Sequence, residues 1–206
     1  GDRISGGQRP RPRPQPGWAL LWLAQGRTAA AQACLHRLLD EAGGPVARAG
    51  TLGPAVEVLL AAGEVVEATE AARELTGLAE TFGCETLTAA AEYAEGQVAL
   101  ATGDPAGALA HLRRAWTHWI GIGGRYDAAR TRVRLAEALR ALGDEVSAVS
   151  ELSVAQRTFA ELGAEPARRE AERLLGGGLP DGLTTREVEV LRLVAECRIG
   201  AFTERH

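Results

Sequence analysis

Three side chains that suit anion recognition stand at helical spacing in the second half of the chain. Tyr126, Arg130 and Arg134 follow one another at intervals of four residues, which places them on one face of a helix. Guanidinium groups bind carboxylates and phosphates through paired hydrogen bonds, so this face could hold an acidic peptide or a phosphate. The same pattern also fits a solvated face on which the arginines pair with Glu137 and neighbouring carboxylates.

A second candidate is an aromatic pair a few residues earlier. Trp116 and Trp119 are three residues apart, so they share a helix face and either pack in the core between repeats or face a ligand. His111 and His118 flank them at a spacing of seven residues. Two helical turns separate these histidines, and we expect them to pack beside the tryptophans rather than to bind a metal ion.

Catalytic and cofactor motifs are missing from the sequence. There is no HExxH motif and no Ser/His/Asp grouping, and all 23 Lys-plus-Arg positions are arginine, so a P-loop lysine is absent. The three cysteines, at positions 34, 84 and 197, are widely spaced and show no CxxC pattern. We therefore expect no enzyme activity, no cofactor and no metal site.

The composition is that of a helical, globular chain. Of its 206 residues 46% are hydrophobic and only 4% aromatic, with Ala, Leu, Arg and Glu dominant, and these residues favour helix. The net charge of −4 gives no overall basic footprint for nucleic acid. No apolar run approaches the ~20 residues of a membrane span, and no signal peptide is recognisable. We expect a cytoplasmic protein without membrane contact and, because it has no methionine, a piece of a longer one.

The chain repeats itself with a period of forty residues. Glycines recur at 63, 103 and 143, and a second series stands at 43, 83, 123 and 163, with an early member of the first series at 26. Small or apolar residues follow the first series at offsets of five, nine and twelve, which lie on one helix face. These three columns are Ala31, Ala68, Ala108 and Ala148; Leu35, Ala72, Leu112 and Leu152; and Leu38, Leu75, Ala115 and Ala155.

The glycines divide the chain into antiparallel helix pairs. We predict helices over residues 18–25, 28–42, 46–61, 65–82, 86–102, 105–120, 125–142 and 145–162, with a closing helix over 166–175. The fold class is therefore all-α, an α-solenoid of about four helix pairs spanning residues 18–175. Before it, residues 1–17 form a disordered Arg-Pro linker, a ligand for a proline-binding module or an arginine arm for an anionic surface. After it, residues 176–182 form a Gly-rich hinge.

The helix pairs resemble tetratricopeptide repeats. The best copy is residues 96–115, where Gly96, Gly103, Ala108, Leu112 and Ala115 stand at matching positions, whereas residues 56 and 136, in place of Gly96, are Val and Ala. The period exceeds the usual 34 residues and is similar to the long repeats of bacterial regulators of the maltose-activator type. The resemblance implies that the first helix of each pair lines a concave groove. A peptide would lie there, against the arginine face described above.

The last 24 residues open with the signature of a helix start. Thr184 followed by Glu187 is a capping box, in which both side chains satisfy free backbone N–H groups. Val190, Leu191 and Val194 then form an apolar stripe at helical spacing.

The sequence of this stretch, including Arg186 beside Glu187, closely resembles the first helix of the LuxR-type helix-turn-helix. In that family Thr184, Arg186, Glu187, Val190, Leu191 and Val194 would belong to a DNA-binding domain. The residues from Cys197 to the end depart from the family pattern, so we expect a truncated helix-turn-helix over 183–206 with only its first helix. A frameshift, a truncated gene or an excised fragment would each produce this ending.

The resemblance implies a transcriptional regulator of the LuxR family, whose repeats sense an effector or couple to an upstream ATP-binding domain of the parent protein. We expect no sequence-specific DNA binding by this chain alone. The alternative is a freestanding tetratricopeptide-like scaffold that binds a protein or peptide partner.

Overall fold

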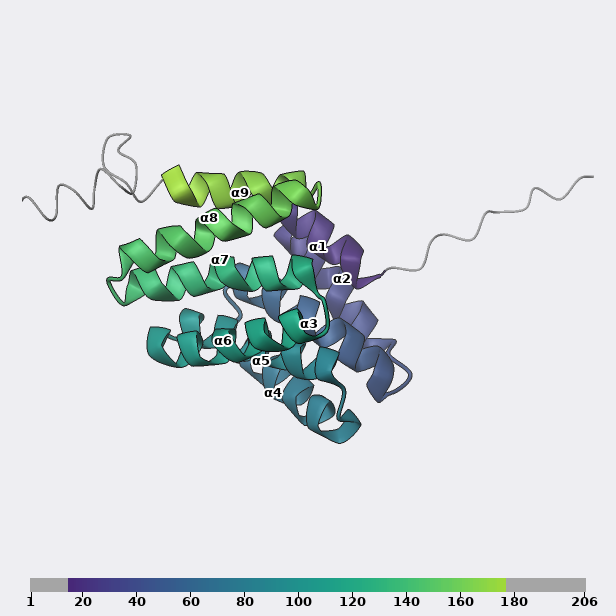
Figure 1. Ribbon diagram of the computed structural model, residues 1–206. Helices are drawn as coiled ribbons and strands as arrows, with labels where there is room; N and C mark the ends of the chain where they lie inside the picture. Colours follow the sequence, from purple (N-terminus) through teal and green to yellow (C-terminus); the bar gives the residue numbers. More distant parts are fainter. Residues whose placement is uncertain (1–14, 177–206) are drawn as a thin grey trace, which may run out of the picture.

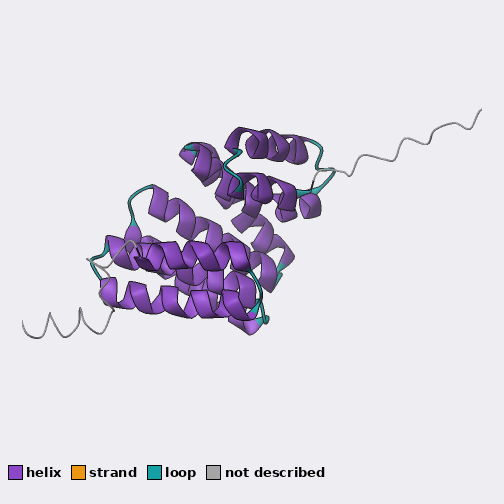
Figure 2. Ribbon diagram, turned by 90° about the horizontal axis from the view of Figure 1, so that it is seen from above, coloured by secondary structure: helices purple, strands orange, loops and turns teal. Residues whose placement is uncertain are grey.

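The computed structural model describes residues 15–176, and within this range the chain is entirely helical and loop (Figures 1 and 2). The expectations for the linker up to residue 14, for the hinge after Gly176 and for the truncated helix-turn-helix lie outside the described residues. Nine helices occupy the range: α1 Pro16–Ala24, α2 Thr28–Asp40, α3 Pro45–Ala62, α4 Val65–Phe82, α5 Glu85–Ala101, α6 Pro105–Gly121, α7 Arg125–Ala141, α8 Glu145–Glu161 and α9 Glu165–Gly176.

These bounds agree with the predicted helices to within about two residues, and one difference has a clear cause. Pro16 and Gly17 were assigned to the linker, because prolines at alternate positions disfavour helix. In the structure Pro16 is instead the first residue of α1. A proline at this position lacks an N–H that would in any case be unpaired, and its fixed φ suits a helix start. The predicted linker boundary at residue 17 is therefore wrong by two residues.

The repeated glycines end the helices in the way the sequence predicts. Seven of them have positive φ angles, between 58° at Gly83 and 85° at Gly63, which is the left-handed backbone that terminates a helix at low cost only in glycine. Gly43 is the exception, since it lies in the loop before α3 without a positive φ. The loop between α2 and α3 is thus built differently from the later turns.

The predicted columns form the core between helices. All four alanines of the first column are completely buried, as are Ala72, Leu112 and Leu152 of the second, and Leu35 is 2% exposed. Of the third column, Leu75, Ala115 and Ala155 are completely buried, while Leu38 is half-buried. The forty-residue period in the sequence is therefore a packing period, which confirms the helical-pair solenoid.

Helix α5 approaches α6 closely at Gly96. A Cβ atom added to Gly96 of α5 would lie 2.6 Å from Cγ and 2.7 Å from Cδ2 of Leu112 in α6. The two neighbouring repeats have other residues at these positions. The preceding repeat has Val56 in place of Gly96 and Ala72 in place of Leu112, and the following repeat has Ala136 and Leu152. All four residues are buried. Relative to Gly96 and Leu112, the preceding pair thus exchanges side-chain volume across the contact, whereas the following pair keeps the leucine and adds one methyl group.

The helix pairs stack so that their first helices lie along one another. Helix α1 contacts α3, α3 contacts α5, and α5 contacts α7, while each second helix packs between its own partner and the next pair. Helix α9 covers the last pair with Ala171 buried against it, and its outer side carries ion pairs such as Arg168 with Glu165. None of the helices between residues 15 and 176 is both long and apolar enough to cross a membrane.

Candidate functional site

The arginine face of α7 opens into a groove on the concave side of the solenoid. Tyr126, Arg130 and Arg134 all line one cavity of about 370 Å³ there, so the structure brings these three predicted residues together. The cavity is bounded by the first helices α1, α3, α5 and α7, by the end of α8 and by α9. Its lining is Leu20, Leu23, Ala24, Glu57, Tyr93, Tyr126, Arg130, Val133, Arg134, Glu137, Phe159, Pro166, Ala167 and Glu170. Helices from the two ends of the solenoid therefore enclose the same groove.

Arg130 is held at the centre of this groove by a partner that is distant in sequence. Its Nη2 atom donates to Oε2 of Glu57 in α3 at 2.5 Å, across 73 residues of chain. The guanidinium carbon lies 5.2 Å from the ring centre of Tyr93 and 5.9 Å from that of Tyr126. The ion pair thus joins α3 to α7 past α5, and two aromatic rings stabilise the cation.

The charges around Arg130 shift the titration of its neighbours. Burial lowers the pKa of Arg130, but its interactions with Tyr93 and Glu57 outweigh burial and raise the pKa above its ordinary value. Burial also raises the pKa of Tyr93 and that of Asp127, whose Oδ1 lies 3.6 Å from Nη1 of Arg130. Arg130 is therefore a permanent cation, and burial disfavours ionisation of Tyr93 and Asp127 beside it.

Arg134 has its partner on its own helix. Its Nη1 atom donates to both carboxylate oxygens of Glu137 at 2.8 Å. This is the pairing that the solvated-face interpretation predicts. Burial alone would lower the pKa of Arg134, and the charges of Tyr93 and Glu137 raise it. Both guanidinium groups therefore already have a carboxylate partner in the structure.

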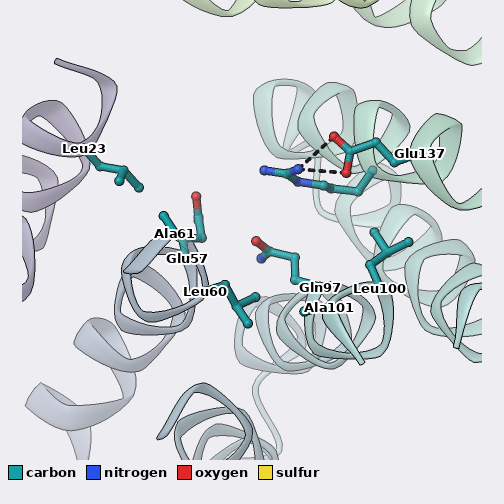
Figure 3. Close-up of a pocket in the computed structure, with 9 residues that line it drawn as sticks. Leu23, Glu57, Leu60, Ala61, Gln97, Leu100, Ala101 and Glu137 are labelled. Atoms are coloured by element: carbon teal, nitrogen blue, oxygen red, sulfur yellow. Dashed lines mark hydrogen bonds and ion pairs between the residues drawn. The ribbon is translucent and has the colours of Figure 1, made fainter. Parts of the chain in front are cut away.

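A second cavity of about 390 Å³ adjoins the first and contains an unsatisfied amide (Figure 3). Gln97 of α5 is 5% exposed, and its Nε2 atom is buried without a hydrogen-bond partner. Figure 3 shows this side chain directed into the space between Glu57 and the paired Glu137. Leaving a buried amide unpaired typically costs about 1–3 kcal/mol, which makes this position a natural contact for a ligand that accepts a hydrogen bond.

These three polar side chains form a column of the repeat. Glu57, Gln97 and Glu137 are each separated by forty residues and come from the consecutive first helices α3, α5 and α7. Each of them comes one residue after a member of the column Val56, Gly96 and Ala136, and that column packs between the two helices of each pair. Our sequence reasoning missed this column, although the period that located the small residues also marks it.

The two tryptophans line neither of these cavities, and their surroundings agree with the first of the two interpretations, packing between helices. Trp116 lines a different cavity, of about 330 Å³ between α6, α7 and α8, with the Arg132 guanidinium 4.7 Å from its ring centre. Trp119 is 9% exposed and packs in the cluster that contains Leu112. Both stand on α6, the second helix of its pair, whose apolar face turns into the packing between pairs rather than onto the concave surface.

The two histidines contact carboxylates of the neighbouring helix. His111 of α6 lies 2.7 Å from Oε2 of Glu92, and His118 lies 3.3 Å from Oε1 of Glu85, both on α5. Between residues 15 and 176 no group of three or more His, Cys, Asp or Glu side chains is arranged to hold a metal ion. The histidines thus join α6 to α5.

No protein-family model and no curated protein matches the chain. A functional assignment therefore rests on the geometry of the groove and on the motifs in the sequence.

Proposed function

We propose that this chain is the partner-binding, repeat-containing region of a LuxR-type transcriptional regulator, and that its concave groove binds an extended segment of another polypeptide. The observation that carries the binding role is the column Glu57, Gln97 and Glu137, which presents acceptors and an unpartnered buried donor along the groove. A polypeptide main chain supplies carbonyl acceptors and N–H donors at regular intervals, so it suits such a row of polar groups.

The ion pairs of the groove favour a neutral segment over a charged one. Among the described residues that line the two cavities there are three glutamates and two arginines, and all five have an ion-pair partner. An acidic ligand would have to displace Glu57 from Arg130, and a cationic one would have to displace Arg130 from Glu57; either leaves a partly buried charge without its partner. The exposed ring of Tyr126 and the leucines of α1 supply apolar contact area.

The test is a selection of displayed 12-residue peptides against the full chain. We expect enriched peptides that bind the wild-type chain and lose at least tenfold in affinity with Tyr126→Ala or Gln97→Leu. Glu80→Ala on α4, which lines neither cavity, is the control and leaves binding unchanged. If no peptide is enriched, or if the groove variants bind as well as the wild type, the proposed function is wrong.

The regulatory context is a separate part of the proposal and is supported by the sequence resemblance of residues 183–196. It is tested on the gene, by translating the DNA that follows the Glu196 codon in the other two frames. A second half of a helix-turn-helix in one of them supports the regulator. Its absence from both favours the freestanding scaffold, which would use the same groove.

A further inference from the structure

A third cavity lies on the side of α7 that faces away from the concave groove. It is the cavity of about 330 Å³ that Trp116 lines, and we call it the α6–α8 cavity, because α6, α7 and α8 all contribute to it. Helix α7 contributes Leu135 and Leu139 here, whereas it turns Arg130 and Arg134 into the groove. The α6–α8 cavity shares no residue with the two cavities of the groove, so it is physically separate from them.

The base of the α6–α8 cavity is apolar. Leu135 and Leu139 are 5% and 8% exposed and form this base. Leu109 and Trp116 are half-buried, line the same cavity and pack against the cluster that contains Leu135. The volume lies near the lower end of the range for small-molecule sites, about 300–1,000 Å³. A cavity of this size and lining suits the apolar body of one small molecule, such as a pair of fused rings.

The charged side chains around this cavity leave one positive charge unbalanced. Arg132 is ion-paired with Glu151 of α8, and its guanidinium carbon lies 4.7 Å from the ring centre of Trp116. Arg113 of α6 is exposed, and no carboxylate between residues 15 and 176 is paired with it. Two guanidinium groups therefore face one carboxylate, and a ligand with a single negative charge would neutralise the difference.

Two hydrogen-bond donors at this cavity have no acceptor within the described part of the chain. The Nε1 atom of Trp116 is buried without a partner, and the guanidinium of Arg113 is the second. Thr117, by contrast, already donates from its hydroxyl to the carbonyl of Arg113 at 2.9 Å. Arg113 and Trp116 are three residues apart on α6, so their side chains are neighbours. A negatively charged acceptor is therefore the group that this pair of donors lacks.

We propose that the α6–α8 cavity binds a small amphipathic carboxylate. The carboxylate accepts hydrogen bonds from Arg113 and from Nε1 of Trp116, and the apolar body lies on the three leucines of the cavity. The Trp116 N–H is buried, so the ligand reaches it after a small rotation of the indole, which no hydrogen bond holds in place. This site is independent of the polypeptide groove, since none of its residues lines the groove.

The experiment titrates sodium 2-naphthoate into the full chain labelled with ¹⁵N in its tryptophan side chains. The chain has four tryptophans, and the indole signal of Trp116 is the one that disappears in Trp116→Phe. We expect this signal to move downfield and to saturate with naphthoate, because its proton gains a charged acceptor. The signals of Trp18 and Trp22 should stay in place, since both lie on α1, which does not line the cavity.

Two comparisons separate the contribution of the carboxylate from that of the ring. Arg113→Gln should weaken 2-naphthoate binding about tenfold, the loss expected for one charge-assisted hydrogen bond. Arg73→Gln on α4 is the matched control and should leave the affinity unchanged, because Arg73 is likewise exposed and lines none of the three cavities. The uncharged analogue 2-naphthalenemethanol should bind the wild type about tenfold more weakly than 2-naphthoate. Thermal unfolding by circular dichroism shows that each variant is folded.

Equal affinities for the acid and the alcohol would overturn the proposal, since the cavity would then be only an apolar recess. Equal losses from Arg113→Gln and Arg73→Gln would overturn it as well, because naphthoate would then respond to the overall charge of the chain. An indole signal of Trp116 that stays in place at millimolar naphthoate would exclude the assigned contact. Naphthoate binding without any enriched peptide would leave this site standing while the proposed groove function fails, so the two tests give separate answers.

Discussion

The exchange of volume between Gly96 and Leu112 can be tested by transplanting the arrangement of the preceding repeat. There the equivalent positions hold Val56 and Ala72, both completely buried. The double variant Gly96→Val with Leu112→Ala copies that pair into the middle repeat. Each single substitution disturbs the contact between α5 and α6, whereas the pair restores a packing that this protein already uses elsewhere.

The magnitudes follow from the contact. A Cβ at position 96 lies 2.6 Å from Cγ of Leu112, so Gly96→Val overfills the site at a cost of about 1–3 kcal/mol, of which helix propensity returns less than ~1 kcal/mol. Leu112 is completely buried, so Leu112→Ala costs about 2–5 kcal/mol. In the double variant the valine fills the space that the leucine leaves, and we expect a favourable coupling energy of about 2 kcal/mol.

The assay is urea unfolding of the four proteins, monitored by circular dichroism at 222 nm. Gly77→Val is the control, because Gly77 also lies inside a helix, α4, but nothing stands within 4 Å of an added Cβ. It should leave the free energy of unfolding unchanged or raise it slightly, and should be additive with Leu112→Ala. A double variant whose cost equals the sum of the two single costs would refute the reasoning.

Two further predictions concern ion pairs between helices, one joining α3 to α7 and one joining α3 to α4. Arg130→Met should lower the free energy of unfolding by about 1–3 kcal/mol, because Glu57 keeps its position without a partner. It should also increase the radius of gyration measured by X-ray scattering, and an unchanged radius would show that the pair does not set the curvature. Arg48 donates from Nε at 2.5 Å and from Nη2 at 2.7 Å to Glu74, and these bonds hold the pKa of that carboxyl below its ordinary value. The ion pair between Arg48 and Glu74 therefore contributes fully to stability above ~4.3, the pKa of a glutamate in the unfolded chain. This contribution is lost as the pH falls below that value. The difference in unfolding free energy between wild type and Glu74→Gln should be largest near pH 7 and shrink by pH 3, whereas a constant difference would contradict the assigned cause.

Much of the architecture could be predicted because it depends on local and periodic properties. A glycine with positive φ ends a helix whatever surrounds it, so Gly63 and its equivalents marked the helix ends correctly. A small residue such as Ala108 permits close packing of the same two helices in every repeat, so its column predicted the core. Pro16 was misassigned because one residue type serves both in a polyproline segment and at the start of a helix.

The candidate site was predicted only in part, for a physical reason. The spacing of Tyr126, Arg130 and Arg134 within one helix was enough to place them on a common face. It could not reveal Glu57 as the partner of Arg130, because that contact depends on how strongly three consecutive helix pairs curve. The two alternatives for Trp116 stayed open because spacing does not tell which side of a helix faces the groove; the packing of α6 between its neighbours decides that.

The sequence by itself therefore determined the number, ends and pairing of the helices from residue 15 to 176, since each follows from backbone preference and a forty-residue packing period. The tertiary structure alone decided the groove. The stacking of successive helix pairs brings α1 and α9 to the same cavity and Glu57 to Arg130. These contacts depend on the arrangement of several helix pairs at once, so no single position encodes them.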